Sequence, residues 1–208
     1  MDRVFLIGVD EAGRGAWAGP VCAGAFCVPI DFDFSLLVGL TDSKKLSPII
    51  RERLFGDIEK LSREGKCRYA FGESDAQCID EVGIREANRR AMKNALIQVL
   101  QNMESDSKYS ILIDGRDNYK FEGISMNLVK YIIHGDLIEP VISAASIIAK
   151  VGRDRIMCDF SKDCPEYQFS LHKGYGTKKH QDALLYYGIH PLHRKSYAPV
   201  KALISEKA

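Results

Sequence analysis

Short apolar runs and longer segments with helical spacing alternate along the chain, and this pattern predicts its secondary structure. Buried strands are expected at residues 4–9, 20–29, 67–72, 110–113 and 126–133. Apolar positions three or four residues apart predict helices at residues 48–63 and 84–103, a long helix from about Pro140, and a last helix between Thr177 and Gly188. The order β-β-α-β-α-β-β-α-α predicts a mixed α/β fold.

The composition is that of a globular protein. The chain has 208 residues, of which 46% are hydrophobic and 27% are charged, a balance far from that of disordered proteins. Because there is no repeat or linker, we expect a single domain over residues 1–208. No run approaches the roughly 20 apolar residues of a membrane span, and the apolar run after Arg3 is too short for a secretory signal. We expect a cytoplasmic protein that does not associate with membranes.

The six cysteines show neither a Cys-x-x-Cys pair nor a grouping with histidine at the spacing of a structural zinc site. Six cysteines form disulfides in some secreted chains, but a chain of this length without an export signal can build a core without them. We therefore expect reduced cysteines that pack in the core.

Charge is distributed unevenly along the chain. The formal net charge is only +1 with neutral histidines, yet residues 143–208 carry a net charge of +5 and residues 1–142 carry −4. A basic C-terminal third fits contact with a polyanion, and it equally fits an ordinary solvated surface. Charge alone leaves both interpretations open.

Acidic residues stand where predicted strands stop. Asp10 and Glu11 end the first strand, Asp114 ends the strand at residues 110–113, and Asp136 precedes the long helix. Neighbouring side chains on a strand normally point to opposite faces. At a strand end the chain twists out of register, so we expect Asp10 and Glu11 to reach one site.

Four carboxylates in one crevice repel one another unless a cation neutralises them. An oxygen-only ligand set favours Mg²⁺ or Mn²⁺ over Zn²⁺, and such ions commonly bind together with substrate phosphates. The same acidic residues also fit turn and helix-cap chemistry. The spacing by itself does not decide between the two.

Longer motifs extend along nearly the whole chain. They are GVDEAGRG at residues 8–15, AGP at 18–20, DSKKLS at 42–47, Asp114-Gly115, Gly135-Asp136, SAASIIAKV at 143–151 with Arg153-Asp154, KGYGT at 173–177 and His193-Arg194. In these motifs the chain resembles type 2 ribonuclease H, specifically bacterial ribonuclease HII. Ribonuclease HIII is the near alternative. The Gly-Arg-Gly form of the first motif and the lack of an extra N-terminal domain before residue 4 favour ribonuclease HII.

The resemblance implies a ribonuclease H-like fold, with a central mixed five-stranded sheet flanked by helices and a helical, substrate-binding C-terminal extension at about residues 160–208. It implies an endonuclease that cuts the RNA strand of RNA/DNA hybrids and nicks duplex DNA on the 5′ side of a single embedded ribonucleotide. Two Mg²⁺ or Mn²⁺ ions would drive hydrolysis and leave 3′-hydroxyl and 5′-phosphate ends. The catalytic metal ligands implied are Asp10, Glu11, Asp114 and Asp136.

The resemblance also implies how the substrate is read. The Gly13-Arg14-Gly15 loop would sense the 2′-hydroxyl, because glycines let the backbone approach the sugar closely. Tyr175 would pack on the deoxyribose that follows the ribonucleotide, and Lys44 would contact a phosphate. Further expectations are Asp154 behind the metal ligands or in a helix-face salt bridge, a monomeric enzyme, and non-specific backbone contacts by Lys45, Lys173, Lys178 and Lys179. The histidines His172, His180 and His193 fit either substrate contact or packing.

Two readings from other classes remain open at this point. One is a non-catalytic nucleic-acid-binding protein whose acidic residues serve only as caps. The other is a metal-dependent enzyme that acts on a small phosphate ester, which would not need a basic C-terminal third.

Overall fold

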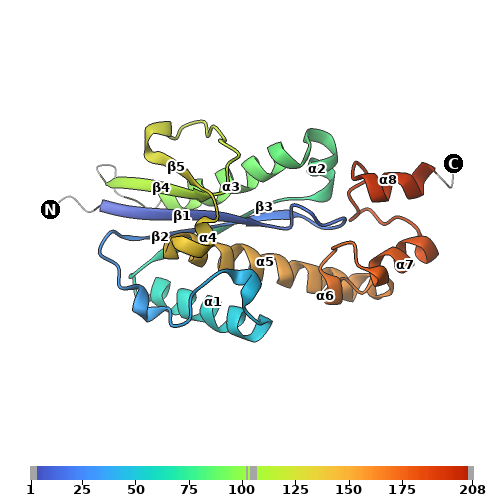
Figure 1. The fold of residues 1–208 in the computed structure, drawn as a ribbon, viewed down its shortest axis with the longest axis horizontal. Coiled ribbons are helices and arrows are strands. Elements are labelled where there is room, and N and C mark those ends of the chain that lie inside the picture. Colours follow the sequence, from blue (N-terminus) through green and yellow to red (C-terminus); the bar gives the residue numbers. More distant parts are fainter. Residues whose placement is uncertain (1–3, 102, 104–106, 206–208) are drawn as a thin grey trace.

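The computed structural model describes residues 4–101, 103 and 107–205, and its centre is a mixed five-stranded sheet (Figure 1). The strands are β1 Val4–Ala12, β2 Val21–Pro29, β3 Arg68–Ser74, β4 Lys108–Asp114 and β5 Val129–Ile132. They are ordered β3-β2-β1-β4-β5. β2 pairs antiparallel with both β1 and β3, whereas β4 runs parallel to β1 and β5. The expected mixed sheet is confirmed.

Helices cover both faces of this sheet (Figure 1). α3 (Ile84–Gln101) packs on one face, and its apolar stripe joins a core cluster with β1, β2 and β4. α1 (Pro48–Arg63) and α5 (Pro140–Asp163) cover the other face. The hydroxyl of Ser47 accepts the amide of Ile50 and so caps α1. These helices lie where their periodicity predicts them, although α3 ends at Gln101 rather than at residue 103.

α5 lies unusually close to the centre of the sheet because two strand residues have no side chain. A Cβ on Gly8 would lie 2.2 Å from the carbonyl oxygen of Val141, and a Cβ on Gly24 would lie 2.2 Å from that of Ala145. The buried face of α5 is correspondingly rich in alanine and serine. This close packing brings the middle of α5 under the carboxyl end of β1.

The C-terminal part of the chain gathers at the far end of α5 (Figure 1). It contains α6 (Phe169–His172), α7 (Lys178–Tyr187) and α8 (Ala198–Ser205). Thr177 caps α7, and the helix ends before Gly188, as the sequence predicts. A small core of its own, which includes Met157, Tyr167 and Phe169, joins this region to α5.

Several short elements differ from the expected order. The first strand does not stop at residue 9 but continues to Ala12. The strand expected at 126–133 is a 3₁₀ turn, Met126–Leu128, followed by the four residues of β5. The short helices α2 (Ala76–Val82) and α4 (Gly135–Ile138) and 3₁₀ turns at Phe34–Leu36, Ser43–Lys45 and Pro165–Tyr167 were not predicted. Elements of three to seven residues are too short to show a helical period.

The cysteines are free thiols, and four of them are buried, as expected for reduced core residues. Burial raises the pKa of the Cys22 thiol to about 12. Within the described residues, none of the helices combines the length and the hydropathy needed to cross a bilayer.

Candidate metal centre and substrate cleft

Three carboxylates converge at one edge of the sheet. Asp10 lies in β1, Asp114 is the last residue of β4, and Asp136 is in the first turn of α4. Each offers one oxygen, and these oxygens all lie within 4.8 Å of one another. β1 and β4 are parallel neighbours, so their carboxyl ends meet at this edge, where ligands of open α/β sheets usually bind.

The chain between β5 and α5 is shaped to present two of these side chains. His134 adopts a left-handed conformation (φ 58°) that turns the chain into α4. The amide of Gly135 then donates to Oδ1 of Asp114 at 2.7 Å. A Cβ on Gly135 would lie 2.5 Å from Cδ1 of Ile142 in α5 and 3.4 Å from Oδ1 of Asp114 in β4, so the lack of a side chain lets α4 pack closely against both elements. Ser143 in turn donates to the carbonyl of Asp136 at 2.8 Å.

Burial and mutual repulsion make this group unfavourable without a cation. Desolvation, together with the charges of Glu11 and Asp114, holds the pKa of Asp10 well above its usual range. Burial and the charge of Asp136 also raise the pKa of Asp114. Oδ2 of Asp10 is buried and has no hydrogen-bond partner among the described residues. An all-oxygen, anionic group with an unpaired buried oxygen fits a hard divalent cation.

Glu11 lies beside this group but not within it. β1 is still paired with β2 at this point, with Asp10 opposite Gly24 and Glu11 opposite Ala23, so the two side chains leave on opposite faces. Ser146 of α5 lies beside Asp10 and opposes the rise in its pKa, whereas Asn88 of α3 lies beside Glu11 and opposes the rise there. Burial raises the pKa of Glu11. The strand continues to Ala12, so the ladder has not ended at residue 10. The charge of Glu11 nevertheless raises the pKa of Asp10, and the charge of Asp114 raises the pKa of Glu11, so Glu11 stays close to the acidic group.

A cleft of about 530 Å³ opens beside the acidic group. Its lining includes every residue that the family resemblance implies for substrate contact, namely Gly13, Arg14, Gly15, Lys44 and Tyr175. Nζ of Lys44 lies 3.5 Å from Oδ2 of Asp136 and so joins the cleft to the carboxylates. The charges of Asp10 and Asp136 raise the pKa of Lys44, against the opposing effect of burial.

The two glycines of the loop have different reasons to be glycine. Gly13 has φ +93°, and a Cβ there would lie 2.0 Å from Nε of Arg153. A Cβ on Gly15 would meet nothing within 4 Å. Gly13 is therefore required by the fold, whereas Gly15 leaves open space on the cleft side.

The side chain of Arg14 is paired with two carboxylates in this structure. Its Nη1 lies 2.6 Å from Oδ2 of Asp117 and 3.5 Å from Oε1 of Glu11. Its carbonyl accepts hydrogen bonds from Arg194 and from the hydroxyl of Tyr197. The side chain of Arg14 thus neutralises carboxylates, and its carbonyl group is fixed by the hydrogen bonds from Arg194 and Tyr197.

The three histidines left open by the sequence are packing residues. His172, His180 and His193 are buried, and the rings of His172 and His180 stack with centroids 4.4 Å apart. His180 joins the carbonyl of Tyr175 through Nδ1 at 3.0 Å and the ring of His193 through Nε2 at 3.0 Å. Desolvation lowers the pKa values of His180 and His193 to about 4. Neutral rings therefore hold the loop that carries Tyr175.

Comparison with known proteins identifies this arrangement. A family model described as Ribonuclease HII matches residues 7–200. The chain belongs to the ribonuclease HII family. The Ribonuclease HII of Dichelobacter nodosus (strain VCS1703A) is 46% identical over 200 residues, which cover 96% of this chain and 97% of the relative. The expected family is confirmed.

Solved structures of ribonucleases H share the fold. The ribonuclease H2 from Pyrococcus horikoshii OT3 matches with a TM-score of 0.72 and 25% identity over 97% of this chain and 98% of that chain. Bst-RNase HIII in complex with Mn²⁺ matches with a TM-score of 0.78 over 99% of this chain and 70% of that chain, at 18% identity. The ribonuclease H-like fold of this family is therefore confirmed as well.

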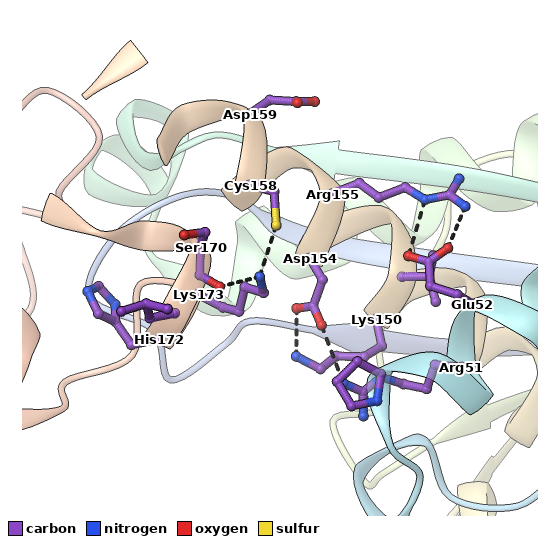
Figure 2. A pocket seen from close by; sticks show the side chains of 13 residues that line it. Arg51, Glu52, Lys150, Asp154, Arg155, Cys158, Asp159, Ser170, His172 and Lys173 are labelled. Atoms are coloured by element: carbon purple, nitrogen blue, oxygen red, sulfur yellow. Dashed lines mark hydrogen bonds and ion pairs between the residues drawn. The ribbon is translucent and has the colours of Figure 1, made fainter. Parts of the chain in front are cut away.

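In this member of the ribonuclease HII family, Asp154 does not contact the acidic group. It accepts from Nζ of Lys150 at 2.7 Å and lies 3.6 Å from Nη2 of Arg51 (Figure 2). Both cations also line the substrate cleft. The pocket in Figure 2, of about 680 Å³, extends the cleft along α1, α5 and α6. Of the two interpretations of Asp154, the helix-face salt bridge matches its contacts.

The lysines expected to hold the nucleic-acid backbone differ in their surroundings. Nζ of Lys173 donates to the carbonyl of Ser170 at 2.6 Å and to Sγ of Cys158 at 3.0 Å (Figure 2). Lys178 pairs with Asp182 at 2.7 Å. Lys45 and Lys179 are exposed.

Sequence reasoning missed the residues that hold the site from behind. Asn88 contacts Glu11 and donates to the hydroxyl of Tyr119, which donates to Asp117. Arg194 donates to the carbonyl of Arg14, which is 180 positions away in the sequence. Contacts between residues so far apart leave no local pattern in the sequence. Two signals were nevertheless present in the sequence: Asn88 is a polar residue on the apolar face of a predicted helix, and Arg153 belongs to one of the family motifs.

Proposed function

We propose that this chain is an endonuclease that hydrolyses the RNA strand of RNA/DNA hybrids and nicks duplex DNA on the 5′ side of an embedded ribonucleotide. Family membership supports the ribonuclease activity. The observation that carries the proposal is that the cleft lined by Glu11, the glycine loop, Lys44 and Tyr175 adjoins the three converging carboxylates. Nζ of Lys44, which lines the cleft, lies 3.5 Å from Oδ2 of Asp136. Chemistry at a phosphodiester and recognition of a sugar backbone would then occur in one place.

Asp10, Asp114 and Asp136 would hold Mg²⁺ or Mn²⁺, and Glu11 would complete the set from the opposite face of β1. The Mn²⁺ complex of Bst-RNase HIII supports a divalent ion in this fold. When bound, divalent ions supply activation of water and stabilisation of the departing oxygen. The carboxylates position these ions, and the products carry 3′-hydroxyl and 5′-phosphate ends.

The glycine loop would distinguish RNA from DNA. Gly15 leaves space on the cleft side, so a sugar could approach the loop backbone closely enough for a peptide group to bond with the 2′-hydroxyl. Lys44, with its Nζ beside Asp136, would contact the scissile phosphate. Its ammonium would neutralise charge that develops on the phosphoryl oxygens.

Tyr175 would read the sugar that follows the ribonucleotide. Its side chain borders the cleft and is 37% exposed. A ring packed on that sugar leaves no room for a 2′-hydroxyl, so the enzyme would recognise a junction between RNA and DNA. The site needs residues of one chain only, which supports a monomeric enzyme. We also propose that it acts in the cytoplasm.

A cleavage assay on a DNA duplex with one ribonucleotide tests the proposal. With Mg²⁺ or Mn²⁺, a single nick 5′ to the ribonucleotide is expected, and a nucleotide monophosphate should remain intact. Hydrolysis of the monophosphate but not the duplex would favour an enzyme of small phosphate esters. Tight duplex binding without any cleavage in either ion would favour the non-catalytic binder.

A further inference from the structure

Two completely buried arginines lie beneath the glycine loop without an acidic partner. Arg153 donates through Nε to the carbonyl of Pro20 at 2.9 Å and through Nη2 to that of Ala18 at 3.1 Å. Arg194 donates to the carbonyls of Gly19, Arg14 and Pro20. Within the described residues, no ion pair joins either guanidinium to a carboxylate. Such burial is unusual, because arginine stays charged and a buried charge is normally paired.

Arg153 also touches two residues that line the cleft, Gly13 and Tyr175. Gly13 packs on its Nε and Cδ so closely that a Cβ would overlap them. Its Cζ lies 5.3 Å from the centroid of the Tyr175 ring, which is the geometry of a cation–π contact. Nη1 of Arg153 is buried and has no hydrogen-bond partner among the described residues. The electron-rich ring face of Tyr175 is therefore one of the groups that stabilise this cation, beside the two carbonyl oxygens.

We propose that Arg153 is a specificity-determining positioning residue, which sets the Tyr175 ring against the glycine loop so that a ribose and the following deoxyribose are read together. This inference rests on the proposed function. One face of the ring lies on the guanidinium, which leaves the other face for the substrate sugar. The guanidinium of Arg153 is held by backbone carbonyl groups and not by a carboxylate. A carboxylate at this position would repel the phosphates of the substrate.

Junction selectivity tests this role, measured as kcat/KM on a duplex with one ribonucleotide divided by kcat/KM on a long RNA/DNA hybrid. Arg153→Met should reduce this ratio by about thirtyfold, the factor of a cation–π contact between desolvated groups. Arg153→Lys, which keeps a cation under the ring, should restore part of the ratio. In a Tyr175→Ala background, Arg153→Met should cause no further loss of selectivity, because its effect passes through the ring.

Arg194→Met is the matched control. Arg194 is equally buried and also holds the loop, but its guanidinium lies over the ring of Tyr197, 5.1 Å from the centroid. It should lower cleavage of both substrates by similar factors. Equal losses on both substrates for Arg153→Met, or losses that add to those of Tyr175→Ala, would overturn the proposal. Failure of both Arg153 variants to fold, judged by circular dichroism, would assign the residue to the core and would also overturn it.

A second readout does not depend on catalysis. Hydroxyl-radical labelling of the free protein, quantified by mass spectrometry, compares Tyr175 with Tyr186, which is exposed on α7 and distant from Arg153 in sequence. Labelling of Tyr175 relative to Tyr186 should rise in Arg153→Met and stay near the wild-type value in Arg194→Met. An unchanged ratio in Arg153→Met would contradict the proposal. If the wild-type protein cuts neither duplex, the proposed function fails, and the labelling result still decides whether Arg153 positions the ring.

Discussion

Asp10 and Glu11 are neighbours in the sequence, yet β1 sends their side chains to opposite faces of the sheet. Asp10 consequently joins two aspartates brought by β4 and α4, whereas Glu11 is held by Arg14 and Asn88. Folding therefore brings three carboxylates of like charge together at a largely buried site. Because burial and neighbouring charges raise the pKa values of Asp10 and Asp114, the folded state binds protons more readily than the unfolded state at these groups.

This repulsion makes the stability of the metal-free protein depend on pH and on Asp114. The pKa values of these carboxyl groups are higher in the folded state than in the unfolded state, so protonation of the groups stabilises the fold. This stabilisation is complete below the ordinary carboxyl pKa of about 4, and it is lost as the pH rises through the pKa values of the folded state. At pH 7 without divalent ions, Asp114→Asn should therefore melt a few degrees above the wild type. Added Mg²⁺ should raise the melting temperature of the wild type more than that of the variant. Equal gains, measured by differential scanning calorimetry, would argue against an ion at this group.

The two glycines of the loop allow a paired test of recognition against folding. Gly15→Ala adds a methyl group that meets nothing in the protein, so it should keep the wild-type melting temperature and lower kcat/KM on a ribonucleotide-containing duplex by at least about tenfold. Gly13→Ala should destabilise the fold by more than about 2 kcal/mol, because of its positive φ and the clash with Arg153. Urea unfolding and initial rates measure the two effects. A Gly15→Ala enzyme with unchanged rate would remove the glycine loop from substrate contact.

At the scale of elements, the segments that could be predicted are those long enough to show a clear strand or helix period. All five strands and the helices α1, α3, α5 and α7 lie at predicted places. The four-residue helices α4 and α6 show no period of their own, and α4 carries Asp136. The acidic residues were predictable because strands end near them. Their division between two faces was not, since it depends on β1 continuing to Ala12, and Arg153 meets its loop only through the tertiary fold.

The approach of α5 to the sheet provides a test at this scale. Gly8→Ala would push a methyl group into the backbone of α5, and it should destabilise the protein by about 3 kcal/mol. Gly56→Ala in α1, where a Cβ meets nothing within 4 Å, is the matched control and should stabilise it by up to about 1 kcal/mol. Chemical denaturation compares the two. A tolerated Gly8→Ala substitution would show that α5 is free to shift away from the carboxylates.

At the scale of the whole molecule, a protein with a net charge of only +1 places its positive excess in the C-terminal third. Those residues form nearly all of α5 and the helices beyond it (Figure 1), and they contribute Tyr175 and Lys150 to the cleft. The negative excess lies in the part of the chain that contains the proposed metal ligands. The net charge near zero is therefore the sum of a negative part, which contains the proposed metal ligands, and a positive part, which is proposed to contact the nucleic-acid backbone.

This distribution predicts strongly salt-dependent binding. Affinity for a duplex with one ribonucleotide, measured by fluorescence anisotropy with Asp114→Asn in Mg²⁺ so that the substrate stays intact, should fall at least about tenfold between about 50 and 200 mM salt. Phosphate contacts would carry most of that affinity. A response that is flat over this range would speak against a duplex substrate.

The central claim is that Asp10, Asp114 and Asp136 hold the divalent ions that drive cleavage. The most direct measurement follows nicking of a duplex with one ribonucleotide by the wild type and by Asp114→Asn, with binding of the same duplex measured in parallel. In Mg²⁺, we expect a loss of at least about a thousandfold in rate for the variant and an affinity within about threefold of the wild type. Near-wild-type turnover by Asp114→Asn would contradict it.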